Sequence, residues 1–206
     1  RHKKDGLNGA IVMNANPFTL GHLYLVQEAA KRCDNLYIFP VRADRSEFPY
    51  KDRYRLIEEG CASIDNAEIL DGGNYIISGA TFPTYFLKQM GEAAQAQAQL
   101  VLDIFARHIA PSLNIKIRFV GSEPLDPFTQ TFNETMLQVL PPHDIKVDII
   151  ERLQSSGQPV SASRVRTLLK EGRLAETQSL VPMSTFAYFS SPAGQKVIAS
   201  LRQCQP

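Results

Sequence analysis

Short apolar runs alternate with longer segments of helical periodicity along this chain. Runs of strand length lie at residues 7–13, 36–41, 67–70, 115–120 and 145–150. Segments with helical spacing or composition lie at residues 20–33, 52–64, 92–111 and 161–172, and Pro111 is expected to end the third of them. Strands separated by helices of this length predict right-handed crossovers, a parallel sheet and helices on both of its faces. The pattern therefore predicts a doubly wound α/β fold.

The helical pattern continues beyond this sheet to the end of the chain. We expect residues 7–180 to form the α/β domain and residues 181–206 to extend it with helices, the last of which starts at Ser191-Pro192. Residues 1–6 are polar and basic, do not begin with Met, and are predicted to be the tail of a linker. With 206 residues, 44% of them hydrophobic, the chain is long enough to bury the core of one such domain.

Composition argues against several classes of function. The 22 Lys and Arg residues against 21 Asp and Glu residues leave a net charge of +1, whereas general nucleic-acid and anionic-membrane binders carry excess basic charge. No apolar run reaches the ~18 residues of a membrane span, and no signal-peptide pattern opens the chain. Cys33, Cys61 and Cys204 lack the spacing of a metal site or a disulfide framework, so we expect reduced thiols in a cytoplasmic protein.

Residues 13–22 form the first segment with candidate chemistry. They join the first strand to the first helix at the carboxyl edge of the sheet, where folds of this kind bind ligands. The backbone N–H groups of the turn and the helix N-terminus favour a phosphate, and Gly21 leaves space for a nucleotide against the backbone. His22 can then donate a hydrogen bond to a phosphate oxygen as charge develops. The structural alternative is that Thr19 only caps the helix and His22 is an ordinary polar residue near its start.

A second segment of this kind opens the helix that follows the last strand. Ser161 is placed at the N-cap, Ser163 adds a second hydroxyl in the first turn, and Arg166 in the second turn can reach the same anion. Taken singly, this is a capped basic amphipathic helix. Together with the turn that contains Thr19 and His22, it predicts that both segments converge on one triphosphate at one edge of the sheet.

These two segments resemble the motifs of the nucleotidyltransferase superfamily, (His/Thr)-x-Gly-His and Ile-Ser-x-x-x-x-Arg. Residues 19–22 match the first in its Thr version, and residues 161–166 match the second, with Val160 in place of Ile. The resemblance implies a Rossmann-like fold that binds ATP, with Mg²⁺ bridging the phosphates. It also implies that His22 and Arg166 stabilise the pyrophosphate side of the transition state, and that Thr19 helps to hold the α-phosphate region.

A narrower resemblance covers most of the chain. Residues 14–22, 42–53, 75–88 and 119–124 are similar to the C-terminal domain of the [citrate (pro-3S)-lyase] ligase family, from which Gly79 is a minor departure. This implies that ATP and acetate form acetyl-adenylate and pyrophosphate. The acetyl group then passes to the thiol of the CoA-derived prosthetic group on the citrate lyase acyl-carrier subunit. It also implies a preceding, acetyltransferase-like domain in the full chain.

Contacts to the two small-molecule substrates are assigned on the same basis. The expected nucleotide-binding residues are Asn14, Asn16, Pro17, Phe18, Gly21, Gly121, Glu123, Ser161 and Ser163. The expected substrate-binding residues are Arg42, Arg53, Ser78 and Thr81. Each has a structural alternative: a solvated arginine, a turn former or a helix cap. Asp44, Asp71 and Asp126 fit a Mg²⁺ ligand and a turn former equally well, so no metal site is assigned.

Two other functions stay open at this point. One is an adenylyltransferase of cofactor biosynthesis of the pantetheine-phosphate type, which shares the Thr-x-Gly-His turn but has a shorter chain and lacks the match at residues 75–88. The other is a non-catalytic nucleotide-binding module that serves a neighbouring domain. The intact pair of His22 and Arg166 argues against the second.

Overall fold

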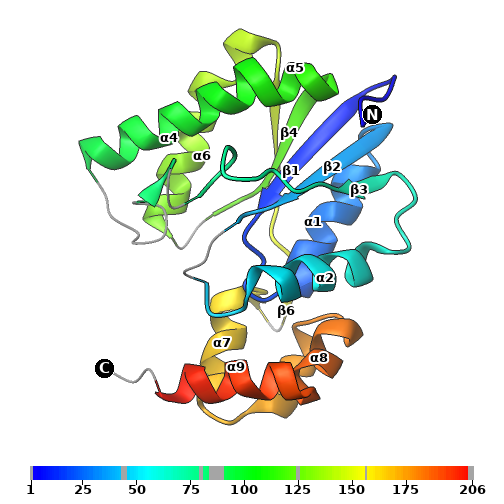
Figure 1. Ribbon diagram of the computed structural model, residues 1–206, viewed down its shortest axis with the longest axis vertical. Helices are drawn as coiled ribbons and strands as arrows, with labels where there is room; N and C mark the ends of the chain where they lie inside the picture. The colour runs from blue at the N-terminus through cyan, green and yellow to red at the C-terminus, as the bar shows by residue number, and fades with distance from the viewer. Residues whose placement is uncertain are drawn as a thin grey trace.

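The chain folds around one parallel sheet of five strands in the order β3-β2-β1-β4-β5. We analysed a computed structural model that describes residues 2–42, 46–78, 81–83, 91–123, 126–155 and 157–203. The strands are β1 Asn8–Met13, β2 Asn35–Pro40, β3 Ala67–Ile69, β4 Ile115–Gly121 and β5 Lys146–Ile150. Because the strand order reverses between β1 and β4, the predicted doubly wound topology is confirmed (Figure 1).

Helices cover both faces of the sheet, as the sequence predicts. Their bounds are α1 Leu20–Ala30 and α2 Tyr50–Cys61 on one face, and α4 Glu92–Ile104 and α6 Pro127–Val139 on the other. Ile11 and Met13 of β1 pack in the cluster that contains α1 and α2, whereas Ala10 packs in the cluster that contains α4 and α6. Successive residues of a strand thus bury opposite faces. Among the described residues, no helix has the length and apolar character of a membrane span.

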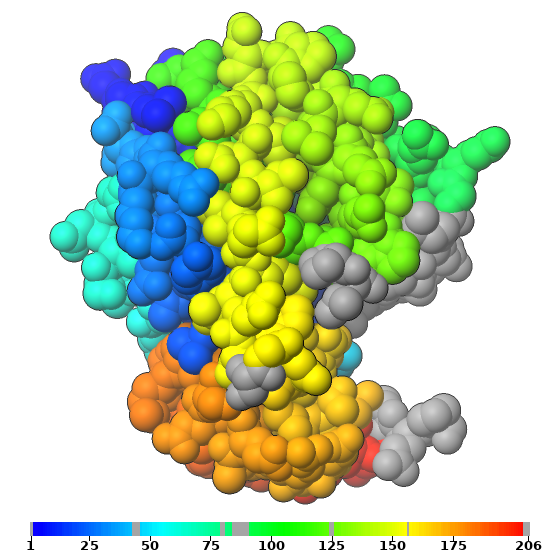
Figure 2. Space-filling model, turned by 180° about the vertical axis from the view of Figure 1, so that it is seen from behind, coloured from blue at the N-terminus to red at the C-terminus, as the bar shows by residue number. Residues whose placement is uncertain are grey.

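The C-terminal helices gather beyond the carboxyl ends of the strands, at the opposite end of the molecule from the N-terminus (Figure 1). A short hairpin and three α-helices follow β5: β6 Gln154–Ser155, β7 Gln158–Pro159, α7 Ala162–Lys170, α8 Met183–Ser190 and α9 Pro192–Gln203. A 3-10 helix, Leu174–Ser179, lies between α7 and α8. Seen from behind, the segment between β5 and α7 runs down onto these helices (Figure 2). As predicted, the last helix begins at Pro192, and the Ser191 hydroxyl accepts a hydrogen bond from the Gly194 N–H at 3.1 Å.

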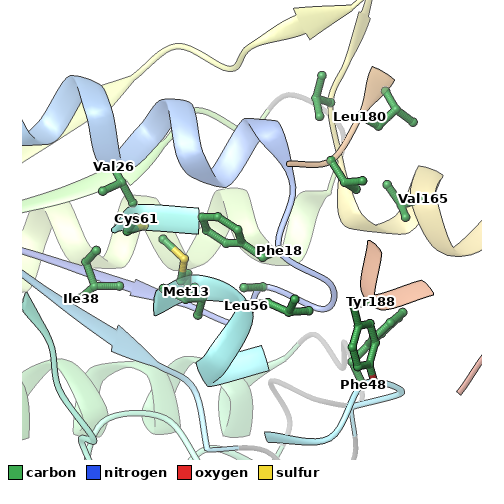
Figure 3. Close-up of a cluster of buried hydrophobic side chains, with 14 of the residues drawn as sticks. Met13, Phe18, Val26, Ile38, Phe48, Leu56, Cys61, Val165, Leu180 and Tyr188 are labelled. Carbon is green, nitrogen blue, oxygen red and sulfur yellow. The ribbon is translucent and has the colours of Figure 1, made fainter. Parts of the chain in front are cut away.

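One hydrophobic cluster joins these helices to the sheet. Val165 of α7 and Tyr188 of α8 belong to the same cluster of buried residues as Met13 of β1 (Figure 3). Phe48, in the loop that precedes α2, packs against Tyr188 with a ring-centroid distance of 6.2 Å. The start of α7 is therefore held against the carboxyl edge of the sheet by shared apolar burial.

Pro111 does not end the helix that begins at Glu92, which corrects the sequence prediction. A π-helical turn, Phe105–Ile109, follows α4, and α5, Ala110–Leu113, continues from it. The Ala110 N–H donates to the Phe105 carbonyl, so the hydrogen-bond pattern widens directly before the proline. Pro111 then lies directly after this widened turn, in the first turn of α5, where a residue without an N–H is tolerated. The helix ends at Asn114, which has a left-handed φ of 53°.

The sequence analysis missed α6, although its start is readable. Asp126 is the N-cap, and its carboxylate accepts from the Phe128 N–H at 3.2 Å and from the Thr129 hydroxyl at 2.8 Å. Pro127 occupies the first helical position, which its fixed φ favours. This helix forms the crossover between β4 and β5, so the acidic loop residue Asp126 is a helix cap.

Cys33 and Cys61 are free thiols, as expected. Burial raises the pKa of Cys33 to about 11 and that of Cys61 to about 12. Both are therefore thiols rather than thiolates at neutral pH, which makes them poor nucleophiles. Cys204, together with Asp44 and Gly79, lies outside the described residues.

Candidate active site

The turn between β1 and α1 is held by its own side chains. Ala15 has a φ of 47°, the Asn16–Pro17 peptide bond is cis, and both Pro17 and Phe18 are buried. Phe18 packs so tightly on Gly60 of α2 that a Cβ on that glycine would lie 2.4 Å from the phenyl ring. The side chains of Pro17 and Phe18 thus belong to the core. The predicted nucleotide contact at these two positions could then be made only by their backbone atoms, and it stays a prediction.

Thr19 and His22 form a reciprocal cap at the start of α1. The Thr19 hydroxyl accepts from the His22 N–H at 3.4 Å, and the Thr19 N–H donates to His22 Nδ1 at 3.1 Å. Since Nδ1 is an acceptor and also lies 2.8 Å from the Thr19 hydroxyl oxygen, the imidazole is neutral with its proton on Nε2. Thr19 is only 1% exposed, and its hydroxyl contacts His22. Thr19 therefore caps the helix, which is one part of the structural alternative. Its contact to the α-phosphate region and the catalytic role of His22 stay predictions.

Burial keeps His22 uncharged. It lowers the pKa of His22 from 6.5 to about 4, with a smaller contribution from the positive charge of Arg152. The unfolded chain binds a proton below pH 6.5, whereas the folded chain does so only near pH 4. The stability due to neutral His22 is therefore present above pH 6.5 and is lost as the pH falls toward 4.

This predicts a midpoint near pH 4 for the His22 imidazole resonances in an NMR titration, with Nε2 protonated throughout the neutral range. A midpoint near pH 6.5 would show that burial does not lower the pKa of His22. A neutral imidazole with its proton on Nδ1 would contradict the assigned tautomer, because a protonated Nδ1 cannot accept from the Thr19 N–H.

The second predicted segment meets the first, as the sequence analysis expects. Arg166 Nη1 donates to the carbonyl of Asn16, 150 positions earlier, at 2.6 Å. At Gly21, a Cβ would lie 2.7 Å from the Val160 carbonyl oxygen. The space beside Gly21 is therefore filled by the chain that leads into α7. The expectation that the space beside Gly21 lies open for a nucleotide is therefore wrong. Because glycine has no side chain, the segment that contains Val160 can pack directly against the β1–α1 turn.

Ser161 takes its predicted place at the N-cap of α7. Its Oγ accepts from the Arg164 N–H at 3.2 Å and lies 3.0 Å from the Ser163 Oγ. The helix opens toward the β1–α1 turn, because Val160, directly before the cap, contacts Gly21. The positive ends of α1 and α7 are thus close to each other, an arrangement that suits an anion.

Glu47 belongs to this site, although the sequence analysis did not single it out. Arg166 Nε pairs with Glu47 Oε1 at 3.2 Å, and Asn16 Nδ2 donates to Glu47 Oε2. Asn16 Oδ1 in turn accepts from the Phe48 N–H at 2.9 Å. The carboxylate and the Asn16 carbonyl hold the guanidinium of Arg166 on two sides. Asn16 thus acts through its side chain as a brace, and its nucleotide contact remains a prediction.

The resemblance implies that Arg166 stabilises the leaving pyrophosphate. On that assignment, we predict that Glu47→Ala lowers the turnover number for pyrophosphate release by about ten-fold, because it removes one of the two groups that orient Arg166. Ten-fold corresponds to about 1.4 kcal/mol in the activation barrier. Glu47 is 40% exposed, so the melting temperature is expected to change little. Steady-state kinetics and a thermal melt measure the two effects. Glu59→Ala, which removes an exposed carboxylate 3.9 Å from Arg55, is the matched control. An unchanged turnover number would show that Arg166 needs no such support.

Arg53 is not a substrate ligand, which corrects the sequence prediction. It is fully buried, and Nε, Nη1 and Nη2 donate to the carbonyls of Phe48, Asn14 and Val41 at 2.9, 2.6 and 3.0 Å. Because these carbonyls follow β1 and β2 and precede α2, Arg53 ties together the loops at the carboxyl edge. Asn14 is held further by Ser46, whose hydroxyl donates to Asn14 Oδ1 at 3.1 Å.

Arg42 and Ser78 lie side by side, although they come from distant segments. They form an isolated parallel bridge beside the end of β2. The Arg42 side chain is about half exposed, with Nη1 3.5 Å from Asp71 Oδ2. The Ser78 N–H donates to the Thr81 hydroxyl at 3.2 Å, and the Thr81 N–H donates to the Ser78 hydroxyl at 3.3 Å. These two hydrogen bonds make the segment a structural turn. Substrate contact by Arg42, Ser78 and Thr81 stays a prediction.

The end of β4 offers both open space and a buried carboxylate. A Cβ at Gly121 would meet no atom of the described residues within 4 Å, consistent with the close approach predicted there. The side chain of Glu123 is 6% exposed, pairs with Arg152 Nη2 and accepts from the Asp126 N–H at 3.1 Å. Glu123 thus already has protein partners, and its predicted contact to ribose stays untested. Arg152, like Glu47, was not singled out from the sequence.

The sheet order, with the two helix starts meeting at its carboxyl edge, defines a Rossmann-like, doubly wound α/β protein. Solved structures agree on the fold. Thermotoga maritima TmcAL bound with alpha-thio ATP has a TM-score of 0.63 at 12% identity, over 93% of this chain and 57% of that one. The NadR protein in complex with NR has a TM-score of 0.57 at 15% identity, over 90% of this chain and 46% of that one.

The family is defined more narrowly by sequence. A model of the citrate lyase ligase C-terminal domain matches residues 8–189, and the chain belongs to this family. The [citrate [pro-3S]-lyase] ligase of Klebsiella pneumoniae is 46% identical over 184 residues, which are 87% of this chain and 54% of that protein. That of Escherichia coli K12 is 44% identical over 190 residues, 89% of this chain and 53% of that protein. The chain thus spans about half the length of the curated relatives it matches.

Proposed function

We propose that this chain carries the ATP site of an acid–thiol ligase that activates citrate lyase. The observation that supports this most is the contact between the segments that contain His22 and Arg166, in a chain of the citrate lyase ligase family. In the first step, a carboxylate oxygen of acetate attacks the α-phosphorus of ATP. The bond from that phosphorus to the bridging oxygen breaks, and pyrophosphate leaves with the electron pair.

His22 and Arg166 have separate roles in this step. The Nε2–H of neutral His22 donates to phosphate oxygens as negative charge builds on the pentacoordinate phosphorus. Arg166, held by Asn16 and Glu47, stabilises the leaving pyrophosphate. Thr19 keeps the imidazole in the required tautomer. The positive ends of the α1 and α7 helix dipoles attract the phosphates. No side chain acts as a nucleophile, because acetate itself attacks.

The remaining substrate assignments follow from position. Arg42, exposed at the end of β2 and bridged to Ser78, orients the acetate carboxylate or a phosphate together with Thr81. Gly121 lets the nucleoside approach β4, with Ser161 and Ser163 near the phosphates. Mg²⁺ would be held mainly by the phosphates of ATP, as is common, and would neutralise part of their charge.

The second step completes the reaction. The thiol of the CoA-derived prosthetic group on the acyl-carrier subunit attacks the acetyl carbonyl and loses its proton. The bond to the phosphate oxygen breaks, and AMP leaves. In this proposal residues 7–180 form the catalytic domain, residues 181–206 extend it, and an N-terminal domain precedes it in the full protein.

The test is an incubation with ATP, Mg²⁺, acetate and deacetylated citrate lyase. The proposal predicts AMP, pyrophosphate and recovered lyase activity, each dependent on acetate. Pyrophosphate that forms only when phosphopantetheine or a nucleotide replaces acetate would instead indicate a cofactor adenylyltransferase.

A further inference from the structure

Arg152 lies two residues after the end of β5, next to Ser122 and Glu123, the two residues that follow β4. Its Nε donates to the Ser122 carbonyl at 2.6 Å, its backbone N–H donates to the Ser122 hydroxyl at 3.3 Å, and its Nη2 pairs with Glu123. No described residue accepts a hydrogen bond from Nη1, and the side chain is 28% exposed. The guanidinium is therefore fixed on one edge and has donors left on the other.

The chain path brings Arg152 close to His22. Leu153, the next residue, accepts through its carbonyl from the Val160 N–H at 2.9 Å, and the Val160 carbonyl oxygen fills the space beside Gly21. His22 directly follows Gly21. The field of the guanidinium also reaches the imidazole, because the positive charge of Arg152 adds to burial in lowering the pKa of His22. A fixed cation thus stands near the end of α1 that receives the phosphates in the proposed function.

We propose that Arg152 binds the triphosphate as a third cationic group, alongside the N-termini of α1 and α7 and opposite Arg166. This inference rests on the proposed ATP site. An arginine fixed by two protein groups loses little freedom on binding a phosphate, and its remaining N–H groups form strong, charge-assisted hydrogen bonds. The competing explanation is that Arg152 only neutralises the carboxylate of Glu123, which is largely buried.

Four variants separate these roles by the affinity for ATP, measured by isothermal titration calorimetry with Mg²⁺ and without acetate. We expect Arg152→Gln to weaken ATP binding at least ten-fold, and Arg152→Lys, which keeps the charge, to weaken it less. The double variant Arg152→Gln with Glu123→Gln leaves no unpaired carboxylate. It should bind ATP more weakly than the Glu123→Gln reference protein, in which any contact of Glu123 with the nucleotide is already lost. Arg32→Gln, which removes a surface cation 3.1 Å from Asp148, is the control and should bind normally.

A second readout does not depend on turnover. Arg152→Gln should raise the pKa of His22, measured by NMR, while Arg32→Gln leaves it unchanged. If the double variant binds ATP as tightly as the Glu123→Gln reference protein, Arg152 serves only to neutralise Glu123 and the inference is wrong. Thermal melts check that each variant is folded. Because ATP binding is measured without acetate or citrate lyase, a failure of the ligase proposal would appear separately, as wild-type protein that binds ATP but releases no acetate-dependent pyrophosphate.

Discussion

Replacing His22 with alanine is expected to lower the rate of acetate-dependent pyrophosphate release by at least ~100-fold, the typical cost of losing one donor to a developing oxyanion. The affinity for ATP should change little, because the helix N-termini and Arg166 still hold the ground-state phosphates. A coupled pyrophosphate assay gives the turnover number, and calorimetry gives the ATP affinity.

Controls separate this effect from a loss of structure. His22→Ala also leaves the Thr19 N–H without its Nδ1 acceptor, so a destabilisation of about 1 kcal/mol is expected in urea unfolding. His108→Ala changes an exposed histidine of the π-helical turn and should have no effect on rate or stability. A His22→Ala protein that is folded and turns over at the wild-type rate would remove His22 from the role proposed here.

The second large effect is on stability. Arg53→Ala removes a fully buried guanidinium and leaves three carbonyls without their donor, at about 1–3 kcal/mol for each unsatisfied group. We therefore expect the free energy of unfolding to fall by about 3 kcal/mol or more, a large share of the stability of a typical domain. Urea unfolding, followed by circular dichroism, measures the change.

A matched variant lies on the same helix. Arg55 of α2 is 53% exposed and pairs with Glu59 at 3.9 Å, so Arg55→Ala should cost less than 1 kcal/mol. Arg53→Met keeps much of the apolar stem but none of the donors, and should be nearly as unstable as Arg53→Ala. If Arg53→Ala were no less stable than Arg55→Ala, the hydrogen bonds of Arg53 to the ends of β1 and β2 would contribute nothing to the free energy of unfolding.

The layered fold follows from local signals in the sequence. Short apolar runs and helical periodicity between them suffice for a parallel doubly wound sheet, and Ser161 and Pro192 mark helix starts by their own chemistry. The same signal was present at Asp126-Pro127, where α6 begins, and was overlooked. The π-helical turn before Pro111 carries no such signal, because a proline mid-segment ordinarily favours a helix end.

The candidate site residues that the sequence makes easiest to identify lie at or near helix starts. Thr19, His22 and Ser161 are found by position, whereas Glu47 and Arg152 depend on partners from distant segments that only the folded chain brings near. Arg53 shows a readable signal that was missed. It lies on the same helical face as Leu56 and Ile57, and an arginine within an apolar stripe is more apt to be buried than to face a ligand.

The most direct measurement is a crystal structure of the protein bound to α,β-methylene-ATP, an analogue that cannot release pyrophosphate. We predict that its phosphates lie between His22 Nε2 and the guanidinium of Arg166, at the paired N-termini of α1 and α7. A nucleotide bound elsewhere, with neither side chain in contact with a phosphate, would contradict the account at its centre.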